Sequence, residues 1–154
     1  ILIHLTTKPD VNLSACLALV SVSRDAERLG DYVKNLFELN SLLKAPKCEQ
    51  EMFRLLFDVT GKDVLGLFEK TSNAFKLSDR DMATEVMNCG REVSKRCEEI
   101  IEKTAESDLS ADQAVVLALG ARYLKRIALH LSNIASSVIN PLPEKDYIPS
   151  ESAK

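Results

Sequence analysis

Apolar residues recur at spacings of three, four and seven positions through most of the chain, which is the pattern of amphipathic helices. The pattern predicts long helices over residues 12–43, 50–75, from 78 onward and 110–139. No segment alternates between apolar and polar residues, so strands are not expected and the predicted fold class is all-α. The expected core positions are Leu13, Leu17, Val20, Leu29, Val33 and Leu36 in the first helix, Phe53, Leu56, Phe57, Val64, Leu67 and Phe68 in the second, and Val86, Val93, Cys97 and Ile100 in the third.

The ends of these helices carry recognisable signals. Asn12 is a favourable N-cap, and Pro46 separates the first helix from the second. Capping boxes of the form S-x-x-D at 78–81 and S-x-x-Q at 110–113 predict the starts of the third and fourth helices. Pro141 then predicts the end of the fourth helix.

The first and last helices are copies of one another. Residues 23–36, SRDAERLGDYVKNL, and 121–134, ARYLKRIALHLSNI, align without gaps, and the match continues back to the helix starts. The helices at 50, 78 and 110 would make one up-down-up bundle, so the helix at 12 would be the last helix of an earlier one. Positions that keep their residue type are Arg24 with Arg122, Arg28 with Arg126, Asn35 with Asn133, Leu29 with Ile127, Val33 with Leu131, and Leu36 with Ile134.

This repeat predicts three parts. Residues 1–44 would be the C-terminal part of a first three-helix repeat, residues 49–140 a complete second repeat, and residues 141–154 a Pro-rich tail. The leading ILIHL is interpreted as the cut end of a helix.

Only the first copy carries a carboxylate pair. Glu27 and Asp31 stand one helical turn apart on the same face, whereas the second copy has Lys125 and Leu129 in their places. One hypothesis is that the pair binds a hard divalent cation, which prefers carboxylate oxygen. The other is that the arginines three residues before each carboxylate form a salt-bridge ladder.

Several other residues have plain structural interpretations. Gly30, whose copy is Ala128, indicates a small residue for close helix packing. His130 has no E-x-x-H or H-x-x-x-H partner, so a structural role is favoured over metal ligation. Cys89 and Cys97 lie at helical spacing and are expected to be small core residues.

Composition excludes several classes of function. With 20 Lys+Arg against 23 Asp+Glu, the chain lacks the basic footprint of a nucleic-acid-binding protein. Its four cysteines form no C-x-x-C pair, which is typical of reduced thiols in a cytoplasmic protein. No apolar run reaches the roughly 18 residues of a transmembrane helix. No catalytic motif is recognisable either, so the chain is not predicted to be an enzyme.

Residues 23–35 closely resemble the signature helix of the PhoU family of phosphate-uptake regulators. The family pattern is an Arg-containing start, then Glu-Arg-(Ile/Leu)-Gly-Asp, and an Asn four residues on; the second copy keeps parts of it at 121–124 and 133–135. The resemblance covers nearly the whole chain apart from the tail. It implies tandem three-helix bundles and cytoplasmic control of phosphate uptake, at the inner face of the membrane where a transporter is bound.

The resemblance also implies metal ligands. In the family, the E-x-x-x-D helix pairs with acidic residues on the preceding helix to hold metal ions at the bundle surface. Glu27 and Asp31 are therefore candidate ligands for a divalent or iron-type ion. The second repeat has lost the pair, and its preceding helix offers only Asn88 and Glu92 near the expected place, which argues against a second site.

Two function hypotheses follow from the resemblance. In the first, the protein is a non-catalytic adaptor between a phosphate transporter subunit and a sensor kinase. In the second, it is the soluble regulatory domain of a covalently linked sodium/phosphate or other ion transporter. A third interpretation, from the residues alone, is a helical oligomerisation module whose carboxylate pair is only a salt-bridge face. Exposed apolar surface on the first helix would favour pairing with another chain, as in a homodimer. The candidate partner-docking residues are Arg24, Arg28, Arg122 and Arg126.

Overall fold

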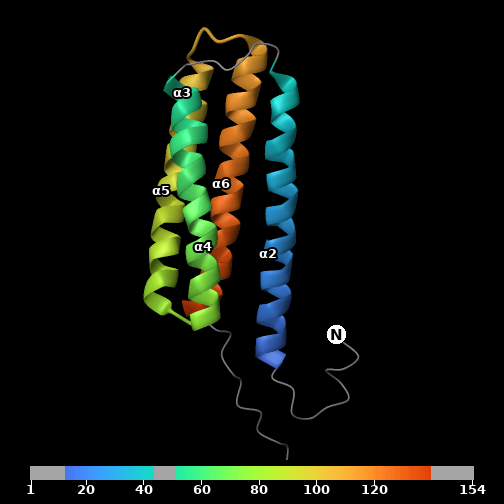
Figure 1. Cartoon of the computed structure of the whole chain (residues 1–154), viewed down its shortest axis with the longest axis vertical. Helices are drawn as coiled ribbons and strands as arrows, with labels where there is room; N and C mark the ends of the chain where they lie inside the picture. The colour runs from blue at the N-terminus through green and yellow to red at the C-terminus, as the bar shows by residue number, and fades with distance from the viewer. Residues whose placement is uncertain (1–12, 44–50, 140–154) are drawn as a thin grey trace, which may run out of the picture.

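The computed structural model describes residues 13–43 and 51–139, and every regular element in these ranges is helical (Figure 1). The all-α prediction is therefore confirmed. The long helices α2, α4, α5 and α6 alternate in direction along the chain, and none of the described helices is long and apolar enough to cross a membrane. The elements are α2 (Leu13–Glu38) with a 3₁₀ turn (Leu39–Leu42), α3 (Glu51–Phe53), a π-helical segment (Arg54–Thr60), α4 (Gly61–Leu77), α5 (Arg80–Ala105) and α6 (Ala111–Ile139).

Helix α6 is the centre of the molecule. It packs against α4 and α5 on one side and against α2 on the other, while α2 has extensive contacts with α6 alone among the long helices (Figure 1). A helix covered from several sides must be apolar around most of its circumference. The buried positions of α6 meet this requirement, and they are Val116, Leu117, Gly120, Ala121, Leu124, Ile127, Ala128, His130, Leu131, Ile134 and Ala135.

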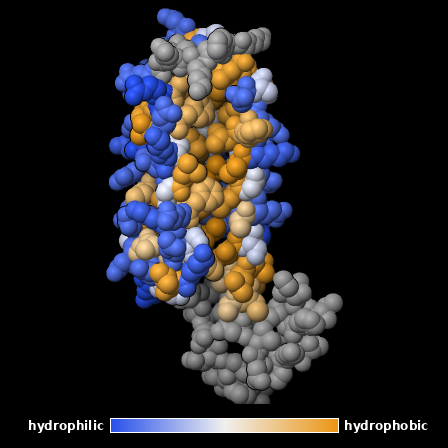
Figure 2. Space-filling view, in the orientation of Figure 1, coloured by the Kyte–Doolittle hydropathy of each residue, from blue (hydrophilic) through white to orange (hydrophobic). Residues whose placement is uncertain are grey.

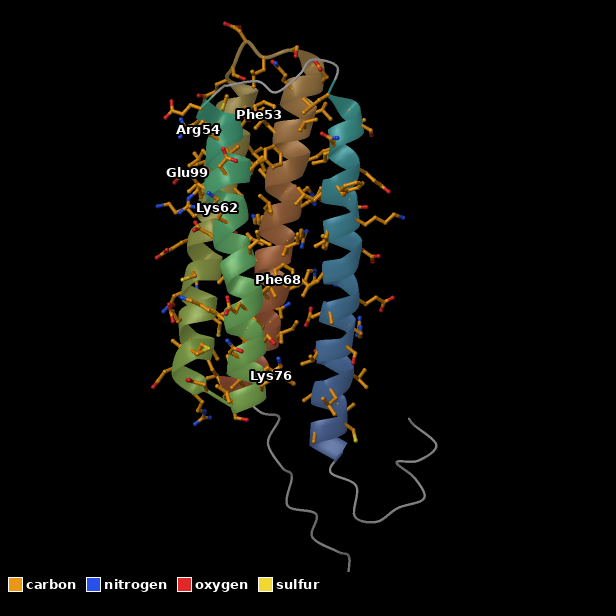
Figure 3. All side chains as sticks on the ribbon, in the orientation of Figure 1. Phe53, Arg54, Lys62, Phe68, Lys76 and Glu99 are labelled. Atoms are coloured by element: carbon orange, nitrogen blue, oxygen red, sulfur yellow. The ribbon has the colours of Figure 1, made fainter. Side chains whose placement is uncertain are left out.

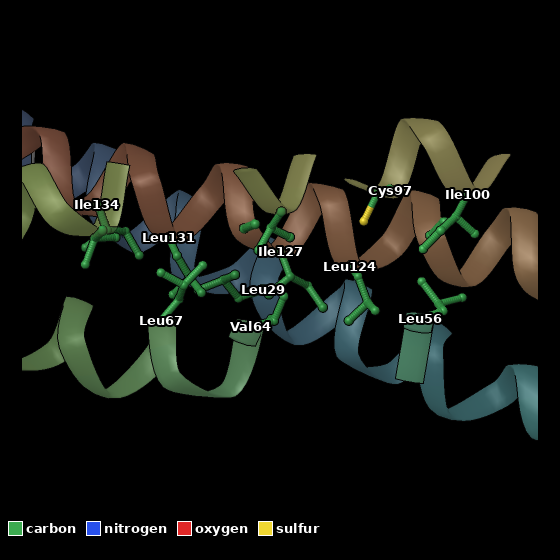
Figure 4. Packing of buried hydrophobic residues seen from close by; sticks show 14 of the residues in the cluster. Leu29, Leu56, Val64, Leu67, Cys97, Ile100, Leu124, Ile127, Leu131 and Ile134 are labelled. Atoms are coloured by element: carbon green, nitrogen blue, oxygen red, sulfur yellow. The ribbon is translucent and has the colours of Figure 1, made fainter. Parts of the chain in front are cut away.

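The core predictions for the second and third helices are confirmed. Leu56, Val86, Cys97 and Ile100 are fully buried, and Figure 4 shows the apolar cluster that α4 and α6 form together with Leu29 of α2. Charged side chains such as those of Lys62 and Glu99 project from the outer side of the α4–α5 pair (Figure 3).

The prediction for the first helix is partly wrong. Leu29 is buried and Leu36 partly buried, but Leu17, Val20 and Val33 are exposed to 50%, 40% and 46%. Periodicity identifies apolar positions but does not tell how many sides of a helix are covered. In the structure α6 covers one side of α2, so only the residues on that side are buried.

Two boundary predictions also need correction. The N-cap of α5 is Asp79, whose side chain accepts a hydrogen bond from the backbone N–H of Met82 at 2.9 Å, and not Ser78. Ser78 instead ends α4 in the left-handed conformation, with φ of 53°. The first helix is also shorter than predicted, because its last turn tightens to 3₁₀ geometry after Glu38. At the fourth helix the predicted contact is present, since the N–H of Ser110 donates to Gln113 Oε1 at 3.4 Å.

Helices α5 and α6 pack closely at Gly90. A Cβ placed there would lie 2.2 Å from Ser132 Oγ, and the Ser132 hydroxyl is itself held by a hydrogen bond to the Ala128 carbonyl. Gly66 on α4 is a useful contrast, because a Cβ at that position would meet nothing within 4 Å. With Ser132 in place, the helix pair thus leaves no room for a Cβ at position 90, whereas there is room for one at position 66.

We predict that Gly90→Ala lowers the free energy of unfolding by about 1 kcal/mol, because the new methyl group displaces Ser132. Gly66→Ala, as the control, should raise it by about 0.5–1 kcal/mol through helix propensity. Urea unfolding measures both changes. Adding Ser132→Ala to Gly90→Ala should restore stability, and a double variant as unstable as Gly90→Ala would contradict this account.

Candidate docking and metal-binding surface

The two repeated helices, α2 and α6, meet in an antiparallel seam with two-fold symmetry. Asp25 of α2 contacts His130 of α6, while Tyr32 of α2 lies 6.1 Å, ring centre to ring centre, from Tyr123 of α6. In the sequence repeat Tyr32 is the copy of His130 and Asp25 the copy of Tyr123. Position 25 of α2 therefore contacts the copy of position 32, and position 32 contacts the copy of position 25. This reciprocity marks an isologous contact.

A buried polar cluster lies in this seam. The Nδ1–H of His130 donates to Asp25 Oδ1 at 2.8 Å, and the side chains are only 7% and 15% exposed. Asn133 donates to the same carboxylate oxygen at 3.4 Å, and Tyr32 stacks on the imidazole with ring centres 5.6 Å apart. The structural role predicted for His130 is confirmed. The sequence analysis did not identify Asp25. Its only signal was that an acidic residue stands where the second copy has the aromatic Tyr123.

Glu27 and Asp31 are both exposed on α2. Neither belongs to an ion pair within the described residues, so the predicted ladder with Arg24 and Arg28 does not form. The same residues also contain no group of three His, Cys, Asp or Glu side chains placed to hold a metal ion. The structure thus leaves the pair facing solvent and supplies two candidate ligands.

In the second repeat the place of Glu27 is taken by Lys125, which forms a surface ion pair between two helices. Lys125 of α6 donates to a carboxylate oxygen of Glu98 on α5. Asn88 and Glu92, the residues expected nearby, are exposed, and Glu92 lines a hollow on the α4 side of α5 instead. Sequence reasoning missed Glu98 because its place opposite Lys125 depends on the crossing of α5 and α6.

That hollow lies between α4 and α5 and has a volume of about 280 Å³. It is lined by the charged residues Lys62, Asp63, Lys70 and Arg96, among others. None of the predicted metal-binding or docking residues lies in it. Its charges are largely paired across the two helices, and the hydrogen bond from Lys70 to Glu85 raises the pKa of Lys70.

The cysteine predictions hold for the described residues. Cys97 is fully buried and Cys89 partly buried, and Cys16, Cys89 and Cys97 are all free thiols. Burial raises the pKa of Cys97 to about 11, so its thiol stays protonated and unreactive near neutral pH. Cys48 lies outside the described residues.

The four predicted docking arginines, two on α2 and two on α6, are all exposed. Within the described residues none of them forms an ion pair.

A mainly apolar stripe of side chains on α2 is exposed to solvent within the described structure, whereas the equivalent positions of α6 are buried. Phe37 is 82% exposed, whereas its copy Ala135 is completely buried. The same contrast holds for the rest of the stripe: Leu19, Ser23, Ala26, Gly30 and Val33 are exposed, and their copies Leu117, Ala121, Leu124, Ala128 and Leu131 are buried. Figure 2 shows an apolar band along the face of the molecule that joins α4, α6 and α2.

The packing prediction for Gly30 is wrong within the described structure. A Cβ at Gly30 would meet nothing within 4 Å, because no described element crosses α2 on that side. Only the copy, Ala128, is closely packed, with its carbonyl against Gly90.

The comparisons with known proteins bear on the same helices. The family model of the PhoU domain matches residues 60–138, which include α4, α5 and nearly all of α6. The chain belongs to the PhoU family. Over 127 residues, 80% of the chain, it is 31% identical to a Thermotoga maritima protein named phosphate-specific transport system accessory protein PhoU homolog 1. The chain spans about half the length of that relative, 54%. No solved structure matches the chain.

We predict that Asp25→Ala lowers the free energy of unfolding by about 1–3 kcal/mol, because it leaves the buried His130 ring without its acceptor. Asp31→Ala is the matched control, since it removes an exposed carboxylate from the same helix and should change stability by less than about 0.5 kcal/mol. Chemical denaturation measures both. Equal effects of the two substitutions would show that the seam contact contributes nothing.

Proposed function

We propose that this protein is a PhoU-type regulator of phosphate transport and phosphate signalling. It acts in the cytoplasm as a non-catalytic adaptor between a phosphate transporter subunit and a sensor kinase. The match of the PhoU domain to residues 60–138 is the observation that carries the proposal. The name of the Thermotoga relative, an accessory protein of phosphate-specific transport, supports it.

The exposed features of the structure suit a docking role. Exposed arginines and an exposed apolar stripe lie on α2, the helix furthest from the α4–α5 pair, with further exposed arginines on α6. Large exposed apolar patches commonly mark interaction surfaces. The exposed arginines of the α2–α6 pair support a docking surface for one of the two partners.

The proposal includes the repeat organisation, with residues 1–44 as part of a first repeat, 49–140 as the second and 141–154 as a tail. The exposed stripe supports this assignment. In α6 the equivalent positions are covered by helices of its own repeat, so the same positions of α2 are shaped to receive helices of a first repeat.

A test of the adaptor function uses the phosphate transporter subunit and the sensor kinase from the same genome, each immobilised for biolayer interferometry. The chain should bind both in a saturable manner. A chain that is folded by circular dichroism and binds neither protein would contradict the proposal.

Metal binding at Glu27 and Asp31 is a further part of the proposal. Their carboxylates would supply two oxygen ligands of a surface site, completed by water or by side chains from outside the described residues. The second repeat does not fit a metal, because Lys125 already places an ammonium group against Glu98. A bound cation would screen the two like charges and order this face of α2.

We expect manganese to bind the chain weakly, with a Kd on the order of 10⁻⁴–10⁻³ M, because two carboxylates are few ligands. Isothermal titration of Mn²⁺ and Mg²⁺ measures this affinity. Glu27→Ala/Asp31→Ala should abolish the binding heat, while Asp81→Ala/Glu85→Ala, another acidic pair one turn apart, should leave it unchanged. Equal heats from the two variants would remove Glu27 and Asp31 as ligands.

A further inference from the structure

We propose that Arg24, Arg28, Arg122 and Arg126, the arginine quartet, form one docking surface across the α2–α6 seam that binds an acidic segment of a partner protein. The inference rests on the adaptor function proposed above. It adds the location of one partner surface and the chemistry of the partner that this surface accepts.

The first support is what the two repeats share. Both copies keep the two arginines, although the residues immediately beside them have diverged from Glu27 to Lys125 and from Asp31 to Leu129. Buried residues shared by the copies, such as Leu29 and Ile127, are explained by packing in the core. The arginines are exposed and form no ion pair within the described residues, so packing inside the chain does not explain them.

The second support is the two-fold symmetry of the seam. The contact of Asp25 with His130 and the contact of Tyr32 with Tyr123 are related by this symmetry, so the axis passes midway between them. That midpoint is close to the level of Arg28 and Arg126. Equivalent residues of the two helices therefore lie on the same side of the seam. This places Arg28 and Arg126 across the seam from each other.

The residues next to the arginines show which face of the α2–α6 pair carries the quartet. Leu29 and Ile127 are buried in the cluster that also contains Val64 of α4 (Figure 4). Arg28 and Arg126 precede them by one position, about 100° around each helix, and are exposed. Arg24 and Arg122 lie one turn earlier on the same sides. The arginine quartet thus occupies the face of the α2–α6 pair that turns away from α4.

The charge of this face differs from that of the whole chain. Four guanidinium groups gather in a protein whose formal net charge is −3. Guanidinium groups bind carboxylates through two parallel hydrogen bonds, and two arginines one turn apart match acidic residues at the same spacing on a helix. Nucleic acid would need a basic footprint along its phosphate backbone, which a chain with 20 Lys+Arg against 23 Asp+Glu lacks.

The shape of the surface favours a protein segment over a small anion. Small-molecule sites are enclosed hollows with convergent polar groups. The two hollows found among the described residues lie between α4 and α5 and beside the π-helical segment, and neither is lined by a residue of the quartet. An exposed face of this kind fits the acidic side of an extended or helical partner segment.

The test uses a fluorescent synthetic helical peptide with glutamates at i, i+4 spacing on one face, and a counterpart with lysines. Anisotropy should show binding of the glutamate peptide alone, weakening as salt is added. Arg28→Glu/Arg126→Glu should weaken binding at least tenfold. Lys95→Glu/Lys103→Glu, which makes the same charge change on the exposed outer face of α5, should leave it within about twofold.

Arg28→Lys/Arg126→Lys adds a test of geometry, because lysine keeps the positive charge but cannot form the two parallel hydrogen bonds of a guanidinium group. Binding by this variant should fall to an intermediate level. Equal losses from both charge-reversal pairs, or undiminished binding by Arg28→Glu/Arg126→Glu, would overturn the proposal. So would tighter binding of inorganic phosphate or duplex DNA than of the glutamate peptide. If these variants still bind the transporter subunit and the kinase, the adaptor function stands and only this surface is wrong.

Discussion

The burial of α6 is the constraint on which the rest of the structure depends. It packs extensively against α2, α4 and α5, and its apolar positions extend around most of its circumference. Such a helix is stable in water only when several neighbours cover it. Close contact with α5 places Gly90 against Ser132, and the contact with α2 brings Asp25 and His130 together in the seam. The arrangement of the other helices follows from covering this one.

The internal repeat allows the two related helices, α2 and α6, to be compared in different surroundings. Two similar helices stand in different environments: α4 and α5 cover α6, whereas among the described residues α2 has extensive contacts with α6 alone of the long helices. Where α6 has Lys125 bound to Glu98, α2 presents Glu27 to solvent. Among the described residues, α6 is thus covered and carries a surface ion pair to α5, while the carboxylates, arginines and apolar stripe of α2 are exposed.

Sequence periodicity predicted the helices and most of the core, because a helix that packs on one side repeats its apolar residues every three or four positions. It could not predict that Leu17, Val20 and Val33 would be exposed, since periodicity does not reveal which side of α2 is covered. Periodicity also does not predict which side chains of distant segments come into contact. Glu98 meets Lys125, and Asp25 meets His130, only because of how the helices cross. The start of α5 was misplaced by one residue because Ser78 and Asp79 are both good caps, and the left-handed turn at Ser78 decides between them.

The central claim is that α6 is covered on the face that remains open in its copy, α2. Hydrogen–deuterium exchange of the backbone amides, followed by mass spectrometry on the intact chain, tests this claim most directly, because protection reflects how firmly each helix is held. The account predicts the slowest exchange in α6 and α5, and clearly faster exchange in α2, which is held through one seam. Protection of α2 equal to that of α6 would show that its stripe is already covered, and would contradict the account.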